Sequence, residues 1–196
     1  MPRRPEEEEV SGTHRAAPRP ALRRFWRLSG LLLLTLVACE KGGGGAESPV
    51  GEEHPLLGVA APEFELPAQH GAKRVNLPAG GDGKVKLVDF WATWCEPCKE
   101  SFPVYQGLAE RYGASLEVIG ISEDDEPGGI KAFAKETGVR FPLAWDEGQA
   151  LSKEYQPPTM PTSYVIDKNG IVRLVHAGFR SGDEAQIAAA IEQASQ

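Results

Sequence analysis

The sequence predicts an α/β fold built on a central mixed β-sheet. Segments 84–92 and 116–122 are rich in apolar and β-branched residues, as strands buried on both faces are, and a helical segment separates them. Two further strand-like segments meet at the tight turn "KNG", residues 168–170. A helical crossover joins parallel strands and a tight turn joins antiparallel ones, so we expect both kinds of pairing in one sheet.

Local signals mark each element of this sheet in order. Two short strands, 64–66 and 73–77, are joined by a turn at His70 and Gly71 and form an N-terminal hairpin. Pro97 stands at a helix start, where its missing N–H is not needed. The remaining predicted strands are 162–167 and 171–178, and the predicted helices are 97–112, 128–138, 149–155 and 183–194.

The charge is unevenly distributed along the 196 residues. Residues 1–38 carry seven arginines and four glutamates, a net charge of +3, whereas residues 39–196 carry 14 basic and 24 acidic side chains, a net charge of −10. An acidic folded part repels phosphates, so we expect no nucleic-acid partner.

A basic and then apolar stretch near the N-terminus is typical of a secretory signal. Three arginines, Arg23, Arg24 and Arg27, precede the apolar segment 28–38. This segment is too short to cross a bilayer, which needs roughly 20 residues. The pattern predicts a signal peptide over residues 1–38 and an extracytoplasmic, periplasmic-side protein.

The segment "LVAC", residues 36–39, resembles the bacterial lipoprotein processing box, in which the cysteine becomes the lipidated first residue. We therefore expect a lipid on Cys39 that anchors the protein to a membrane. Residues 39–58 are rich in glycine and proline and predict a flexible tether. The folded domain is then expected over residues 59–196.

Cys95 and Cys98 directly follow the predicted strand 84–92, at the start of a predicted helix. Such a pair can be a redox couple, half of a zinc site or a structural disulfide. A structural zinc site needs four ligands, and the four histidines of the chain lack ligand spacing, so we predict no metal. A bridge that closes so short a segment restricts the unfolded chain little. These considerations favour the redox couple.

A helix N-terminus stabilises the thiolate that attacks a disulfide, because its free N–H groups carry partial positive charge. We expect Cys95 to be the more exposed, attacking thiol, and Cys98, one turn inside, to resolve the mixed disulfide. Glu96 is expected to oppose the Cys95 thiolate and Lys99 to favour it, while Pro97 limits the conformations of the loop.

Four segments of the folded part are distinctive: "APEFEL" (61–66), "VDFWATWCEPCK" (88–99), "SFPVYQGLAERY" (101–112) and "MPTSYVIDKNG" (160–170). Together they resemble the TlpA/ResA-like branch of membrane-anchored thioredoxin-fold oxidoreductases, over about residues 58–195. The resemblance implies a thioredoxin fold, a central mixed sheet flanked by helices with an N-terminal β-hairpin extension. It also implies thiol–disulfide exchange outside the cytoplasm and no cofactor beyond a redox-active Cys95–Cys98 disulfide.

In this family a cis proline faces the cysteine pair, and Pro161 is the matching residue; the alternative is an ordinary loop proline. The resemblance places the backbone of Met160 beside Cys95, where it can pair with an extended client strand. We therefore expect the client-binding surface to consist of Trp94, Glu96, Pro97, Met160, Pro161 and Thr162.

The chain departs from the branch at one position. Three residues after the second cysteine, where the branch carries glutamate, this chain has Ser101, and the neighbouring Glu100 is rotated by about 100° on a helix. Asp89 lies where thioredoxin itself places a buried carboxylate. Burial in an apolar strand raises a carboxylate pKa and prepares it to take a proton from Cys98. We expect Asp89 to transfer this proton; the alternative is a carboxylate satisfied by a backbone N–H or an ordered water.

Other conspicuous residues predict no chemistry. The acidic segment "SEDDE", 122–126, lacks the spacing of a calcium loop and predicts a solvated loop. Trp91 is expected to be a core residue, and His176 a packing or surface residue.

The function expected from the resemblance is reduction of disulfides in exported client proteins. By the same resemblance, the clients are apocytochromes c awaiting haem or copper-site proteins of respiratory oxidases. A membrane thiol–disulfide reductant is expected to supply the reducing equivalents. Two alternatives stay open at this point: a thiol oxidant, and a metal or haem chaperone of the same fold.

Overall fold

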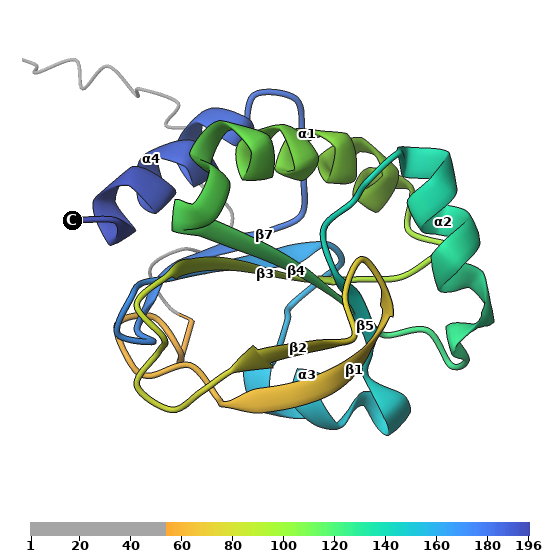
Figure 1. Cartoon of the computed structure of the whole chain (residues 1–196), viewed down its shortest axis with the longest axis horizontal. Coiled ribbons are helices and arrows are strands. Elements are labelled where there is room, and N and C mark those ends of the chain that lie inside the picture. Colours follow the sequence, from red (N-terminus) through yellow and green to blue (C-terminus); the bar gives the residue numbers. More distant parts are fainter. Residues whose placement is uncertain (1–53) are drawn as a thin grey trace, which may run out of the picture. The chain divides into compact units, whose positions relative to one another are not determined.

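The computed structural model describes residues 54–196, which form a seven-stranded mixed sheet with helices on both faces (Figure 1). The strand order is β2-β1-β5-β4-β3-β6-β7. The strands are β1 (Phe64–His70), β2 (Arg74–Leu77), β3 (Val85–Trp91), β4 (Leu116–Ser122), β5 (Leu143–Trp145), β6 (Thr162–Ile166) and β7 (Val172–Ala177). The α-helices are α1 (Glu96–Tyr112), α2 (Ile130–Thr137), α3 (Ala150–Tyr155) and α4 (Glu184–Ala194).

Strand β3 lies at the centre of the sheet, and all of its residues are buried. It pairs in parallel with β4 along its whole length, from Val85 opposite Leu116 to Trp91 opposite Ser122. On its other side it pairs antiparallel with β6. A strand covered on both faces needs apolar residues at successive positions, which is what the sequence of β3 provides. The predicted mixed sheet is confirmed.

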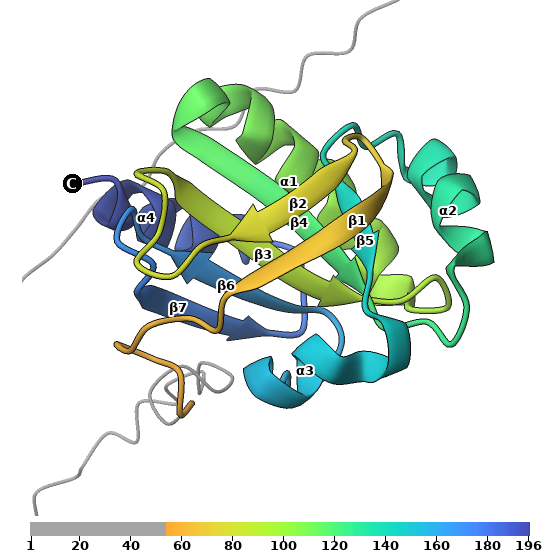
Figure 2. The same ribbon diagram turned by 60° about the horizontal axis from the view of Figure 1, so that its bottom comes forward.

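The side chains of β3 alternate between two hydrophobic cores. Leu87 and Trp91 face a core closed by α1, α2 and α4, whereas Val88 and Phe90 face a core closed by α3 and the β1–β2 hairpin. Figures 1 and 2 show α1 and α4 on one side of the sheet and α3 on the other. The two-residue period of a strand therefore places Asp89 on the side that α1 covers.

The predicted N-terminal hairpin is present at one edge of the sheet. Strands β1 and β2 pair antiparallel, with Phe64 opposite Leu77. The turn between them needs Gly71, because its φ is +77° and an added Cβ would lie 2.8 Å from the backbone O of Arg140. Strand β1 continues to His70, beyond the predicted strand 64–66, because its second half pairs with β5.

Two features differ from the expectation. Strand β5 was not predicted. Residues 54–58, expected to belong to the tether, pack on the domain: the Nε2 atom of His54 lies 3.1 Å from the backbone O of Gln156, and the Gly58 N–H donates to Val172 O at 2.9 Å. The predicted signal peptide and the predicted lipid site at Cys39 lie outside the described residues.

Candidate active site

Cys95 and Cys98 lie where the sequence places them, at the carboxyl end of β3 and the N-terminus of α1. Cys95 is the N-cap, and its Sγ accepts the backbone N–H of Cys98 at 3.3 Å. Pro97 occupies the first helical turn, which leaves no intrahelical donor missing. The two cysteines form a disulfide with their Cα atoms 5.3 Å apart. The N–H of Cys98 at the helix end thus points at the Cys95 sulfur, and an N–H donor at a helix N-terminus stabilises a thiolate.

Both cysteines are largely covered by the protein. Cys95 is 4% exposed and Cys98 is 0% exposed, so their order agrees with the expectation, but Cys95 is less accessible than expected for an attacking thiol. The preceding residue, Trp94, is 67% exposed. A client that reaches Cys95 therefore also contacts the indole of Trp94.

The charged residues beside Cys95 pair with each other. Lys99 Nζ lies 3.1 Å from a carboxylate oxygen of Glu96 and 3.4 Å from one of Glu136. The hydrogen bond to Glu96 and the charge of Glu136 raise the pKa of Lys99. The electric fields of two opposite charges in contact largely cancel at a third group. The effects expected of Glu96 and Lys99 on the Cys95 thiolate therefore offset each other.

Asp89 is fully buried on β3, opposite Ser163 of β6. Its Oδ1 accepts a hydrogen bond from Ser163 Oγ at 2.6 Å, and this hydroxyl lies 2.7 Å from the hydroxyl of Tyr105 on α1. Its Oδ2 is buried and has no hydrogen-bond partner among residues 54–196. One hydroxyl does not replace the water that an ionised carboxylate loses on burial, so the neutral acid is favoured.

Burial raises the pKa of Asp89 to about 8, and the hydrogen bond from Ser163 lowers it only in part. The carboxyl group is therefore mostly protonated at neutral pH, with a pKa close to the pH at which it would work. No carboxylate takes the place of the glutamate of the resembled branch: the Ser101 hydroxyl donates to the backbone O of Cys98 at 3.2 Å, and Glu100 is exposed.

The loop between α3 and β6 brings part of the predicted client surface to Trp94. The Met160–Pro161 peptide bond is cis, as the family resemblance implies, and the Pro161 carbonyl accepts the N–H of Gly178 at 2.7 Å. Between this loop and the cysteine loop lies a groove of about 250 Å³. It is lined by Trp94, Glu123, Pro157, Thr159 and Met160.

Four of the predicted client contacts do not line this groove. Thr162 is fully buried, and its hydroxyl donates to the backbone O of Thr159 at 2.7 Å. Pro161 is also buried, whereas Glu96 and Pro97 are exposed outside the groove. The Thr162 side chain thus supports the loop from beneath, which corrects its expected place on the client-binding surface.

Glu123 is a groove residue that the sequence reasoning missed. Its backbone N–H donates to Trp91 O at 2.8 Å, and its backbone O accepts from Gln149 Nε2 at 3.1 Å. Burial, together with the negative charge of Asp146, raises the pKa of Glu123 to about 7. One signal was available: Glu123 directly follows β4, and the carboxyl ends of parallel strands meet at the edge that carries Cys95.

The acidic segment 122–126 is only in part the solvated loop that we expected: Asp125 and Glu126 are exposed, but Asp124 is not. Asp124 is buried and accepts hydrogen bonds from the backbone N–H of Thr93 at 3.1 Å and from its hydroxyl at 2.8 Å. Its other oxygen accepts from Ser122 Oγ at 2.8 Å. These bonds tie the cysteine loop to the end of β4.

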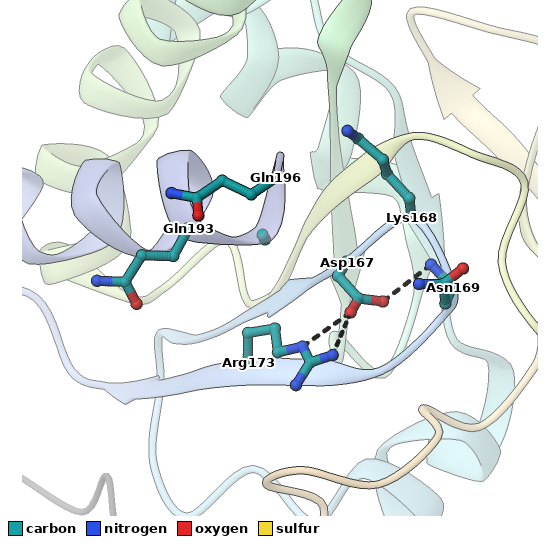
Figure 3. Close-up of a pocket in the computed structure, with 7 residues that line it drawn as sticks. Asp167, Lys168, Asn169, Arg173, Gln193 and Gln196 are labelled. Carbon is teal, nitrogen blue, oxygen red and sulfur yellow. Dashed lines mark hydrogen bonds and ion pairs between the residues drawn. The ribbon is translucent and has the colours of Figure 1, made fainter.

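A second hollow, of about 440 Å³, lies between the β6–β7 turn and the end of α4 (Figure 3). Because β6 runs antiparallel to β3, this turn is at the opposite edge of the sheet from the cysteines. Arg173 and the backbone of Asn169 bond to Asp167, with Arg173 Nε 2.8 Å from Oδ2 and Asn169 N 2.9 Å from Oδ1. Lys168 donates to the backbone O of Ser195. The charged side chains that line this hollow thus already have hydrogen-bond partners within the protein.

Between residues 54 and 196, no three histidine, cysteine, aspartate or glutamate side chains are grouped so that they could hold a metal ion. None of the helices in that part of the chain has the length and apolarity to span a bilayer.

Residues 57–175 match the AhpC/TSA family. The chain is 30% identical over 132 residues to the "Thioredoxin-like protein YneN" of Bacillus subtilis strain 168, covering 66% of this chain and 76% of the relative. It is also 30% identical over 159 residues to the "Thiol-disulfide oxidoreductase ResA" of the same organism, covering 80% of this chain and 86% of the relative.

The fold resembles solved structures as well. A crystal structure of a "putative Thiol:disulfide interchange protein DsbE from Chlorobium tepidum" superposes with a TM-score of 0.66 at 34% identity, covering 71% of this chain and 98% of that one. The family match extends over more than half of the chain and includes β3, the cysteine pair and the cis-proline loop. The chain belongs to the AhpC/TSA family and has the thioredoxin fold.

Proposed function

We propose that this protein is an extracytoplasmic, lipid-anchored thiol–disulfide oxidoreductase that reduces disulfides in client proteins. The observation that carries the proposal is the Cys95–Cys98 disulfide at the N-terminus of α1, on a strand that also holds the buried, proton-carrying Asp89. The names of the similar proteins ResA and DsbE describe thiol–disulfide exchange, which supports the same reaction class.

The first step uses Cys95. In the reduced protein its thiolate attacks one sulfur of a client disulfide, so a bond forms between Cys95 Sγ and that sulfur while the client S–S bond breaks. The second client sulfur leaves as a thiolate and takes a proton from solvent. The N-terminus of α1 supplies the positive potential that keeps Cys95 ionised before the attack.

The second step uses Cys98 and Asp89. The Cys98 thiol gives its proton to the Asp89 carboxylate, and its sulfur attacks Cys95 Sγ. The bond between Cys95 and the client breaks, and the client thiolate leaves and is protonated. Two electrons have then passed from the protein dithiol to the client, and the protein holds the disulfide seen in the structure.

Regeneration runs the same chemistry in reverse. A thiolate of a membrane thiol–disulfide reductant attacks Cys95, and the departing Cys98 sulfur takes its proton back from Asp89. The second thiol of the reductant then attacks the first, so the reductant keeps the disulfide and Cys95 leaves as a thiolate. A carboxyl group with a pKa of about 8 suits both directions, because it is neither fully protonated nor fully ionised near neutral pH. This is the reason for assigning the proton-transfer role to Asp89.

The direction of net exchange is the part of the proposal that depends on the reduction potential. Resemblance of the active-site segment to the membrane-anchored branch favours a reductase, for which we expect a potential below about −230 mV. The N-cap position of Cys95 favours the competing role of thiol oxidant, because a stabilised thiolate makes the disulfide more oxidising. Equilibration with glutathione buffers decides between the two.

The proposed location rests on sequence features outside the described residues, and the proposed clients rest on the family resemblance. We propose that Cys39 carries the lipid and that clients include apocytochromes c or copper-site proteins. Incorporation of labelled fatty acid that is lost in Cys39→Ser tests the anchor. If the variant incorporates as much label as the wild type, Cys39 is not the lipid site.

Trapping tests the reaction itself. Cys98→Ser leaves no resolving thiol, so Cys95 should retain clients as mixed disulfides that mass spectrometry can identify. The matched Cys95→Ser variant should retain none. Capture by Cys95→Ser instead would reverse the assignment of the two thiols, and capture by neither would contradict the proposed function.

A further inference from the structure

We propose that the groove beside the cysteine pair binds an arginine or lysine side chain of the client, with Glu123 as the recognising group. This inference rests on the proposed function, because it names the client chemistry that the redox site selects. The groove adjoins that site: Trp94 is the residue before Cys95, and Met160 is the residue before the cis Pro161. A client segment bound to Cys95 therefore lies within reach of it.

The position of Glu123 is fixed by its backbone. Its N–H donates to Trp91 O and its carbonyl accepts from the side chain of Gln149, so both backbone polar groups of the residue are hydrogen-bonded. Its Oε1 is buried and has no hydrogen-bond partner among the described residues. A carboxylate without a donor is costly to ionise, so a ligand whose donor reaches the part of Glu123 that lines the groove gains free energy there.

The sign of the charge points to a cation. No lysine or arginine in residues 54–196 forms an ion pair with Glu123, unlike Glu96, Glu110 and Glu117, which do have such partners. The negative charge of Asp146 destabilises ionised Glu123, so a cation in the groove would offset it. Asp146 itself is engaged, because its two oxygens accept the backbone N–H groups of Leu151 and Ser152 at 3.0 and 2.8 Å.

The remaining wall of the groove suits the same ligand. Trp94 presents a largely exposed indole, and guanidinium groups stack on indole faces through cation–π attraction. A groove of about 250 Å³ accepts a single side chain rather than a folded partner. We therefore expect arginine to bind better than lysine, since it offers both a stacking plane and several donors.

Paired peptide substrates test this inference. The two peptides of a pair contain the same disulfide-linked cysteine and differ at one position within two residues of it. One peptide has arginine there, and the other has its neutral isostere citrulline. For the full-length reduced protein, we expect kcat/KM to favour arginine by about tenfold at one position or more, as a charge-assisted hydrogen bond provides. Glu123→Gln should lose this ratio. Asp125→Asn, which removes an exposed charge from the same loop, should keep it.

A wild-type measurement guards against a folding defect in the variant. The arginine-to-citrulline ratio should rise as pH passes through about 7, because Glu123 ionises there. The titratable groups coupled to Glu123 are Asp146 and Tyr164, and the ratio cancels effects of Asp89 that both peptides share. Equal rates for both members of every pair would overturn the inference and leave the proposed function standing. No reduction of any peptide would contradict both.

Discussion

Lys86 and Asp89 are two fully buried ionisable side chains on the same strand, and the protein satisfies them very differently. Lys86 Nζ lies 2.9 Å from Asp82 Oδ2 and also forms an ion pair with Glu117. Asp89 has a single hydroxyl partner, Ser163, and its Oδ2 has none among residues 54–196. Three positions apart on a strand, the two side chains point to opposite faces of the sheet.

The difference indicates that one buried ionisable group contributes to stability and the other to the reaction. A buried lysine with two carboxylate partners is costly to replace, because its removal leaves those carboxylates without their cation. A buried acid with one neutral partner is kept protonated at a cost in stability, and such groups mark sites of proton transfer. We therefore expect Lys86 to matter for folding and Asp89 to matter for the reaction.

The largest expected effect concerns the reaction. Asp89→Asn should slow resolution of the mixed disulfide by about 100-fold or more at pH 7, because Cys98 loses its proton acceptor. Single-turnover kinetics with a fluorescent disulfide peptide measure this step. Glu100→Gln, which neutralises an exposed carboxylate on α1, should react like the wild type. If both variants slow this step equally, the loss of any negative charge near the site explains the effect, and the specific role of Asp89 is contradicted.

The next effect concerns stability. Lys86→Ala should lower the free energy of unfolding by about 3 kcal/mol, because it removes a buried ion-pair partner and its packing volume. The rate per folded molecule should not change. Lys86→Met restores volume without charge and should lose less. If urea unfolding finds both variants as stable as the wild type, the ion pairs do not hold this part of the sheet.

A smaller effect of opposite sign is expected for Asp89. Its folded-state pKa of about 8 exceeds the ordinary value of 3.8, so between these limits the folded protein keeps a proton that the unfolded chain releases. Wild-type stability therefore falls as pH rises through this window. Asp89→Asn removes that titration and should be more stable than the wild type at pH 7, with a gain that shrinks as pH falls and vanishes near pH 4. A gain that is independent of pH would need another cause.

The smallest effect concerns the partner of Asp89. The hydrogen bond from Ser163 lowers the pKa of Asp89, so Ser163→Ala should raise it, by about one pH unit. Tyr105→Phe removes only the hydroxyl behind Ser163 and should shift it less. The pH midpoint of the exchange rate gives both shifts. A larger shift in Tyr105→Phe would place the controlling hydrogen bond at Tyr105.

Elements with strong local patterns were predictable from the sequence. Strand β4 occupies residues 116–122 as predicted, because seven successive residues favour a buried strand. Strand β5 was missed, because three residues, Leu143–Trp145, are too few to show a period and become a strand only by pairing with β4 and β1. Burial of Asp89 was predictable because its neighbours in the sequence are apolar.

Side-chain partners across the fold were not predictable. Ser163 as the hydroxyl partner of Asp89 depends on the register of β6 against β3, and the place of Thr162 beneath the loop depends on the same register. Glu123 and Asp124 are adjacent acidic residues, yet one lines a groove and the other binds Thr93. Only the position of the loop relative to the cysteines distinguishes them.

The pH dependence of disulfide exchange in the wild type and in Asp89→Asn tests the central claim most directly. Rates of reduction of the Cys95–Cys98 disulfide by a small dithiol should show, in the wild type, a titration near pH 8 from Asp89 in addition to that of the attacking thiol. In Asp89→Asn this additional titration should be absent. Profiles of the same shape in both proteins would contradict the role of Asp89 as the proton-transfer group.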